Sequence, residues 1–213
     1  TYAKGPSWDA GDIEAYKASL IAAGYSASTI TGYLVIVRKF FAWSEAVGFF
    51  TNIAKYVSGV ARVRGHRHPY LTTDDVLAIL KTADNKTPEG RRNYSILNLM
   101  VRAGLRGIEL ARADVGDVFV WGRSRVLNMG KVDGKSLMFL TSDMWVPIQK
   151  HLKERRVLSK PGAPLFASLS SRNLGDRLTP RTFSGIANNA IEAAGLGGRG
   201  LSATALRKQS LYL

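Results

Sequence analysis

The spacing of the apolar residues constrains the fold of this chain more than any other feature. Through most of the sequence, apolar residues recur every three or four positions, as they do along one face of an α-helix. Over residues 116–141 the pattern changes to short runs of β-branched and aromatic residues, separated by turns that contain glycine. The sequence therefore predicts a mainly α-helical protein with one small antiparallel β-sheet.

Two helices are predicted in the first 48 residues. Asp9 is placed to cap the first of them. Along this helix, Ile13, Tyr16 and Leu20 are spaced on one face, which predicts a shared apolar surface. The second helix covers residues 26–48 and begins with hydroxyl side chains that suit a helix N-terminus.

A short basic stretch over residues 57–71 separates these helices from the rest of the chain. Gly65 and Pro69 interrupt it, which is typical of a linker between domains. We therefore expect an N-terminal helical domain, a linker and a larger second domain, at residues 1–64, 65–70 and 71–213 respectively.

The second domain begins with a predicted helix at Thr72, where Asp75 completes a capping box. Leu77 and Leu80 belong to the apolar stripe expected along this helix. Further helices are predicted over residues 88–104, 143–157 and 179–195 and from about residue 202.

Charge is the unusual part of the composition. Thirty lysines and arginines face sixteen acidic residues, which makes the net charge +14 and the pI about 10.2. Such an excess of positive charge favours a polyanionic partner, nucleic acid above all. A protein that is basic for other reasons is the alternative.

The residue types that are missing exclude several classes of site. Without cysteine, the chain forms no disulfide, thiolate metal site or cysteine nucleophile. His66 and His68 are close together but lack a nearby third ligand, so we expect no metal. No apolar run is long enough to span a membrane, and no signal peptide opens the sequence. These features predict a cytoplasmic, nucleoid-associated protein without a membrane partner.

Arg106 is an unexpected residue for its surroundings. An apolar helix leads through Gly104 into a second predicted helix that begins at about Gly107. An arginine held at such a junction can offer two donors to the oxygens of one phosphate. Glu109, three residues on, can instead make a structural ion pair with it. At this point both interpretations stay open.

Two further cationic features accompany Arg106. Lys131 and Lys135 lie in the turn GKVDGK between two predicted strands, where a lysine can reach across a cleft. An ordinary turn residue is the alternative for each. Arg207 lies in LSATALRKQSL, again within a helical and mostly apolar context.

Together these segments resemble the tyrosine recombinases of the phage integrase family. AGLRGIELARADVGDV is similar to the first arginine box of the family, and LSATALRKQSL resembles the second. LNMGKVDGKSLMFLTSDMWVPI is similar to the hairpin that carries the family's lysine. Residues 11–57 resemble the helical, SAM-like core-binding domain that precedes the catalytic domain. The resemblance covers essentially the whole chain.

The resemblance implies site-specific DNA recombination, including integration of mobile elements, through a 3′-phosphotyrosine and without a cofactor. Arg106 and Arg207 would hold the scissile phosphate, Glu109 would support Arg106, and Lys131 would protonate the leaving 5′ oxygen. The implied partner is double-stranded DNA, on which full-length members form tetramers that join two sites. The side chains expected to contact DNA are Thr29, Arg38, Lys39, Arg62, Arg64, Arg67, Lys135 and Lys208.

The sequence departs from the family pattern at three places, one of which is that the lysine hairpin is one residue longer than usual. Thr204 stands where the family has histidine or lysine, and threonine cannot shuttle a proton near neutral pH. Tyr212, the only tyrosine after Arg207, is in the same predicted helix, too close to serve as the nucleophile. We therefore expect a C-terminally truncated recombinase that binds DNA without cleaving it.

Two other functions compete with this interpretation. A non-catalytic, recombinase-like protein that binds DNA and regulates recombination is favoured by Thr204 and by the missing nucleophile. Lys131 favours the enzyme, because a protein that only binds DNA does not need a proton donor there. A helical RNA-binding protein that matches these segments by chance is the third alternative.

Overall fold

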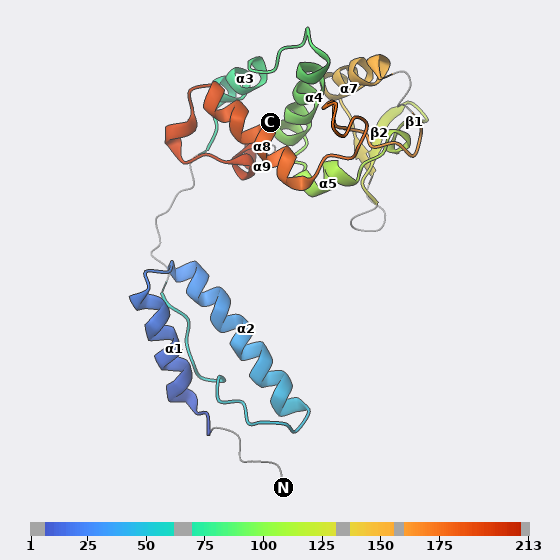
Figure 1. The fold of residues 1–213 in the computed structure, drawn as a ribbon. Helices are drawn as coiled ribbons and strands as arrows, with labels where there is room; N and C mark the ends of the chain where they lie inside the picture. Colours follow the sequence, from blue (N-terminus) through green and yellow to red (C-terminus); the bar gives the residue numbers. More distant parts are fainter. Residues whose placement is uncertain (1–6, 62–69, 131–136, 156–159, 210–213) are drawn as a thin grey trace. The chain divides into compact units, whose positions relative to one another are not determined.

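The computed structural model describes residues 7–61, 70–130, 137–155 and 160–209, with the side chains of the last segment described as far as residue 207 (Figure 1). The chain divides into two units, residues 1–67 and residues 68–213. Each unit has its own hydrophobic core, so the two are described separately.

Unit 1 contains two helices, α1 (Ala10–Ala22) and α2 (Ala27–Ala46). The side chain of Asp9 accepts hydrogen bonds from the backbone at the start of α1, as predicted. Ser26 caps α2 by accepting a hydrogen bond from the backbone N–H of Thr29. Local capping therefore defines where both helices begin.

The core of unit 1 is small. Its buried residues lie on the facing sides of α1 and α2 and on the segment after α2; they are Ile13, Leu20, Ile30, Leu34, Phe41, Ala54 and Val57. The prediction that Tyr16 shares this buried face is wrong, because Tyr16 is 42% exposed. Since α2 is the helix that packs against α1, it covers only a narrow stripe of α1.

A second apolar row lies on the exposed surface of α2. Its members are spaced alternately three and four residues apart and are between 39% and 66% exposed: Tyr33, Ile36, Phe40, Trp43 and Val47. The rings of Phe40 and Trp43 lie 6.0 Å apart between centroids. We call these five residues the α2 stripe. Unit 1 thus has apolar residues on both the inner and the outer side of this helix.

Unit 2 is mainly helical with one three-stranded sheet, which confirms the predicted fold class. Its helices are α3 (Thr73–Lys81), α4 (Pro88–Arg102), α5 (Gly107–Arg112), α7 (Ser142–Glu154), α8 (Pro180–Ala193) and α9 (Ala203–Gln209). Its strands are β1 (Val118–Trp121), β2 (Ser124–Asn128) and β3 (Leu137–Phe139). Two short 3₁₀ turns cover Val115–Asp117 and Gly197–Arg199.

The sheet is antiparallel with the strand order β1-β2-β3. Val118, Leu127 and Met138 are cross-strand partners and pack on the core of unit 2. Residues 131–136, which contain the predicted lysine turn, lie outside the described residues.

Helix α4 is the centre of unit 2, where α3, α7, α8 and α9 pack around it (Figure 1). Thr72 and Asp75 form the predicted capping box at the start of α3. The prediction for Leu77 is wrong, because this side chain is 45% exposed while Ile79 is buried. The buried face of α3 is centred on Ile79 and Leu80, the side that α4 and α8 cover.

Pro147 lies inside α7 and removes one bond from its backbone ladder. A proline has no N–H to donate to the carbonyl four residues earlier, which here is the carbonyl of Asp143. The buried side chain of Asn98, on α4, donates a hydrogen bond to this carbonyl instead. The proline in α7 is therefore compensated by a polar contact that joins α7 to α4.

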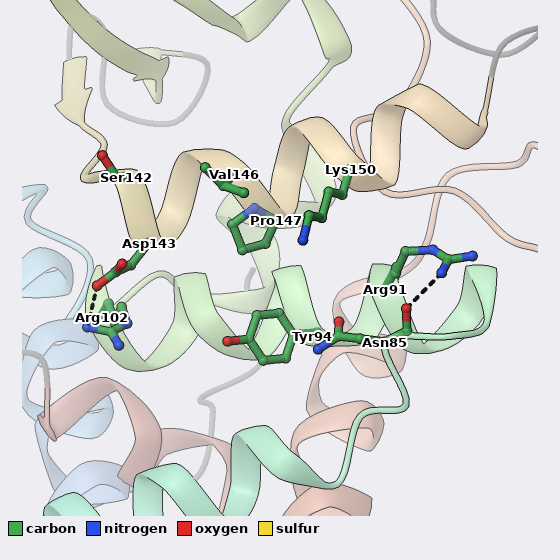
Figure 2. Close-up of a pocket in the computed structure, with 9 residues that line it drawn as sticks. All are labelled: Asn85, Arg91, Tyr94, Arg102, Ser142, Asp143, Val146, Pro147 and Lys150. Carbon is green, nitrogen blue, oxygen red and sulfur yellow. Dashed lines mark hydrogen bonds and ion pairs between the residues drawn. The ribbon is translucent and has the colours of Figure 1, made fainter.

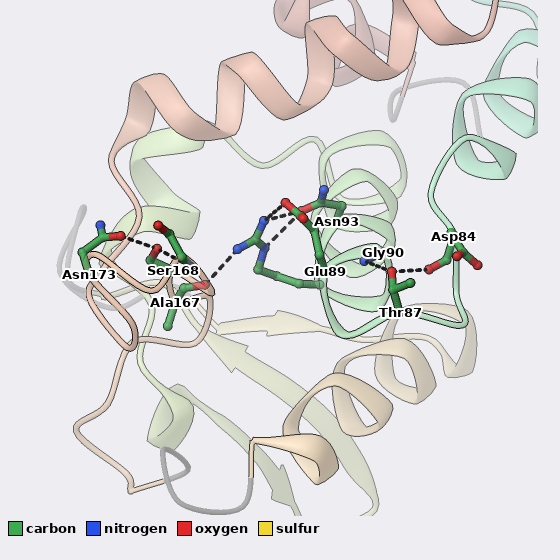
Figure 3. Close-up of polar contacts among 10 residues, drawn as sticks. Asp84, Thr87, Glu89, Gly90, Asn93, Ala167, Ser168 and Asn173 are labelled. Atoms are coloured by element: carbon green, nitrogen blue, oxygen red, sulfur yellow. Dashed lines mark hydrogen bonds and ion pairs between the residues drawn. The ribbon is translucent and has the colours of Figure 1, made fainter.

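Some of the positive charge of this chain is structural. Buried Arg92 on α4 donates a hydrogen bond to the carbonyl of Ala167 over 3.1 Å and pairs with Glu89 over 3.0 Å (Figure 3). Buried Arg155 donates to the carbonyls of Pro164 and Leu165 over 2.8 and 2.6 Å. Both arginines thus tie the segment after α7 to the helical core, and they are not available to a nucleic acid.

Candidate active site

Arg106 lies at the N-terminus of α5, where the chain leaves the core for one residue. Its neighbour Leu105 and the following Leu110 are both buried, whereas Arg106 is exposed. Helix α4 ends at Arg102, and Gly104 adopts a left-handed φ of 64° that turns the chain toward α5. The predicted break between two helices is confirmed, and it presents Arg106 to solvent.

Glu109 supports Arg106 in a different way from the one predicted. Its carboxylate accepts a hydrogen bond from the backbone N–H of Arg106 over 2.6 Å. Within the described part of the chain, no ion pair joins the two side chains. Glu109 therefore caps the helix with its charge at the favourable end of the helix dipole. This contact involves the backbone of Arg106 and not its guanidinium.

Helix α5 is held firmly at both of its ends. At its start, a Cβ atom on Gly107 would lie 3.0 Å from the carbonyl oxygen of Pro180 and 3.2 Å from Phe183 Cβ, so glycine allows close contact with α8. At its end, Arg177 donates to the carbonyls of Ala111 and Ala113 over 2.8 and 3.2 Å. The position of α5, and with it the backbone of Arg106, is therefore fixed by unit 2 itself.

Arg207 lies on α9, next to Leu206, which is completely buried. Burial of Leu206 holds this face of α9 on the core, so that Arg207 and Thr204 are exposed. At the start of the helix, the backbone N–H of Ala203 donates to the Asn188 side chain on α8 over 3.0 Å.

Helix α8 packs against both α5 and α9. The two arginines that the sequence singled out are therefore carried by two helices that share one support. The first turn of α8 adds a third exposed arginine, Arg181, beside the point where Gly107 meets Pro180. Arg181 was not predicted from the sequence; its position directly after Pro180, at the start of a helix, was the signal that could have identified it.

Other predicted site residues are not tested by the structure. Lys131, Lys135, Arg62, Arg64, Arg67 and Tyr212 lie outside the described residues, as does the side chain of Lys208. On α2, Thr29 is half-buried and its hydroxyl is 2.9 Å from that of Ser26. Arg38 is half-buried and Lys39 is exposed, and as consecutive residues they point about 100° apart around the helix.

Among the described residues, no three histidine, cysteine or acidic side chains are grouped in a way that could hold a metal ion. The helices that the structure describes include none with the length and apolar character needed to cross a membrane.

The architecture is that of the tyrosine recombinases, as two solved structures illustrate. Lambda integrase (residues 75–356), determined as a dimer bound to a COC′ core site, matches 97% of this chain and 73% of its own with a TM-score of 0.69 and 20% identity. The XerH site-specific recombinase, in a post-cleavage complex with a palindromic difH substrate, matches 96% of this chain and 60% of its own with a TM-score of 0.72 and 19% identity. At these identities the likeness concerns the fold.

The chain belongs to the phage integrase family, whose family model matches residues 69–211. The tyrosine recombinase XerC of Vibrio vulnificus is 33% identical over 180 residues, which are 83% of this chain and 54% of XerC. A tyrosine recombinase of Synechococcus elongatus is 28% identical over 187 residues, 86% of this chain and 58% of the relative. The chain thus spans little more than half the length of these curated relatives.

Proposed function

We propose that this chain is part of a site-specific DNA recombinase and that it binds the scissile phosphate of duplex DNA through Arg106 and Arg207. The observation that carries the proposal is the exposure of both arginines on helices that pack against the same helix, α8. Family membership and the net charge of +14 support it. Fixed guanidinium groups are suited to this task because their donors match the oxygens of a phosphate.

In the proposed reaction, a tyrosine hydroxyl oxygen forms a bond to the scissile phosphorus, and the bond from phosphorus to the 5′ oxygen breaks. The products are a 3′-phosphotyrosine and a free 5′ hydroxyl. Arg106 and Arg207 stabilise the negative charge that develops on the non-bridging oxygens. Lys131 gives its proton to the departing 5′ oxygen. Glu109 is a positioning residue, because it acts on Arg106 through the backbone.

Thr204 is exposed on α9, three residues before Arg207. In the proposed site its hydroxyl donates a hydrogen bond to the phosphate but does not act as a base, since its proton is not lost near neutral pH. The attacking tyrosine would lie outside the 213 residues, and two pairs of subunits would act on two DNA sites. The same proposal includes contacts with the DNA duplex by the predicted DNA-binding residues. Thr29, Arg38 and Lys39 on α2 are among them, as are Arg62, Arg64 and Arg67.

Trapping of a covalent adduct tests the enzymatic part. The complete reading frame is incubated with a nicked suicide duplex, and the protein–DNA adduct is measured after denaturing electrophoresis. We expect Arg106→Ala and Arg207→Ala each to lower adduct formation by at least about 100-fold, the effect of losing a group that stabilises transition-state charge. Arg172→Ala, which changes an exposed arginine that belongs to neither α5 nor α9, is the matched control and should form adduct normally.

Duplex binding, measured by mobility shift at a fixed salt concentration, separates chemistry from affinity. Both variants should bind within a few-fold of the unchanged protein, because many phosphate contacts share the affinity. Unchanged adduct formation in both variants would disprove the assigned roles. Duplex binding without any adduct from the complete protein would instead favour the non-catalytic, regulatory alternative, which Thr204 supports.

A further inference from the structure

A slot between α4 and α7 lies outside the proposed active site. Its volume is about 470 Å³, within the range of pockets that hold small ligands. The lining residues come from both helices and from the turn before α4: Asn85, Arg91, Tyr94, Arg102, Ser142, Asp143, Val146, Pro147 and Lys150. No residue of either arginine box is among them.

The charge of the slot suits an anion. Arg102 and Arg91 lie at its two ends, and Lys150 extends from α7 toward α4 between them (Figure 2). Asp143 is the acidic residue among the lining side chains, and its carboxylate lies 3.5 Å from Arg102. In the part of the chain that the structure describes, Lys150 makes no ion pair, so one cation of the slot is left for a ligand.

The two arginines are held in place by neighbouring groups. Arg91 Nη1 donates to the carbonyl of Asn85 over 2.7 Å, and its Nε pairs with Glu154 over 2.6 Å. Arg102 Nε donates to the Asn98 side chain over 2.8 Å. Because these groups are already oriented, an anion that binds between them loses less side-chain freedom than at a flexible surface.

The slot also has flat apolar walls. Tyr94 of α4 lies opposite Pro147 and Val146 of α7, and its ring makes no contact with another described aromatic ring (Figure 2). Tyr94 is half-buried and lines the slot, and a tyrosine ring that borders a cavity can stack with a planar base. Cations that bind phosphates, next to an aromatic ring that stacks with a base, are the combination that suits a nucleotide.

A second, adjoining cavity of about 560 Å³ shares Asn85, Arg91 and Lys150 with the slot. It adds Lys153 and Glu154, one turn further along α7. The cationic surface therefore continues beyond the slot and is longer than one phosphate group. Glu154 is paired with Arg91, so its negative charge is partly neutralised and repels a bound anion less.

We propose that the slot between α4 and α7 binds a nucleotide unit, with the base on Tyr94 and the phosphates at Lys150 and Arg91. The unit belongs either to a free nucleotide or to a nucleic acid strand, since both carry the same base and phosphate chemistry. This site is separate from the proposed phosphate clamp of Arg106 and Arg207 and does not depend on it.

Calorimetric titration of the chain with ADP tests the proposal, with adenosine and inorganic pyrophosphate as half-ligands. ADP should bind more tightly than either half-ligand, because only ADP uses both the ring and the cations. Lys150→Ala should weaken ADP binding about 10- to 100-fold, as expected for a charge-assisted contact. Tyr94→Leu should weaken it about 10-fold through the loss of stacking. Lys81→Ala, at an exposed lysine of α3 outside the slot, is the control and should change nothing.

A single-stranded hexadeoxyadenylate, titrated in the same way, identifies the source of the nucleotide. Stronger binding of the hexamer than of ADP, with the same loss in Lys150→Ala, would assign the slot to a strand. Stronger binding of ADP would assign it to a free nucleotide. If neither ligand binds, or if Lys150→Ala binds both as the Lys81→Ala control does, the proposal is wrong. Lys150 is exposed, so its replacement leaves the fold intact.

Discussion

The two units of this chain bury their apolar residues to very different extents. Among the described residues, the core cluster of unit 2 contains 25 buried residues, including several of α4, while the core cluster of unit 1 contains seven. Unit 1 nevertheless carries the α2 stripe on its surface. The difference shows that a regular helical pattern does not by itself determine how much of a helix is buried. In unit 2, contacts from several helices hold each element, and this unit carries the arginines of the proposed active site.

The difference in the cores is tested most strongly by Leu99→Ala on α4. Leu99 is fully buried, so truncation leaves a cavity and should lower the free energy of unfolding of unit 2 by about 3 kcal/mol. Urea titration followed by separate signals from the two units measures the effect. Leu77→Ala, on the exposed side of α3, should cost less than about 1 kcal/mol. A fall of both unfolding transitions together in Leu99→Ala would show that the units do not unfold independently.

Buried His151 makes the stability of unit 2 depend on pH. The imidazole is 2% exposed and stacks on Phe166, and its Nε2 has no hydrogen-bond partner. Burial lowers the pKa of His151 from 6.5 to about 4, and the nearby positive charges of Arg155 and Arg92 act in the same direction. A backbone hydrogen bond with Leu165 opposes them.

Because its folded pKa is the lower one, His151 takes up a proton more readily in the unfolded chain. The stability of unit 2 should therefore fall as the pH drops from about 6.5 to about 4, by up to about 3 kcal/mol from this group. Urea titrations at several pH values measure this slope. His151→Phe, which keeps a ring against Phe166, should flatten it. Equal slopes in the two proteins would contradict the assignment.

The smallest effect is expected in unit 1, on the α2 stripe. Ile36 is 66% exposed, so Ile36→Lys should change the free energy of unfolding of unit 1 by no more than about 0.5 kcal/mol. Leu34→Lys, two residues away on the buried face, should unfold the unit, because it places an unpaired charge in the core. Circular dichroism during urea titration distinguishes them. An Ile36→Lys variant as unstable as Leu34→Lys would show that the stripe belongs to the core.

The sequence predicted the features of this fold that depend on neighbouring residues. The capping box of Thr72 and Asp75, the break at Gly104 and the change of period at the sheet were all readable. Each depends on backbone geometry or on hydrogen bonds within a few positions of the chain. For the same reason the arginine boxes could be found, since Arg106 and its cap Glu109 are three residues apart.

Which face of a helix is covered could not be read in the same way. Tyr16 and Leu77 fit the helical period but are exposed, because the neighbouring helices cover a narrower stripe than the pattern suggests. Likewise, the total charge could not separate the arginines that hold backbone carbonyls, such as Arg92 and Arg155, from those that face solvent.

By itself, then, the sequence determined the main helices and the sheet with their approximate positions, and the family to which the chain belongs. Only the tertiary structure decided that Glu109 binds a backbone N–H, that α8 supports both Arg106 and Arg207, and that α4 and α7 enclose a cationic slot. The physical reason is the separation along the sequence of the residues that interact. Periodicity and capping act within one or two helical turns, whereas burial and charge pairing depend on segments that folding brings together from far along the chain.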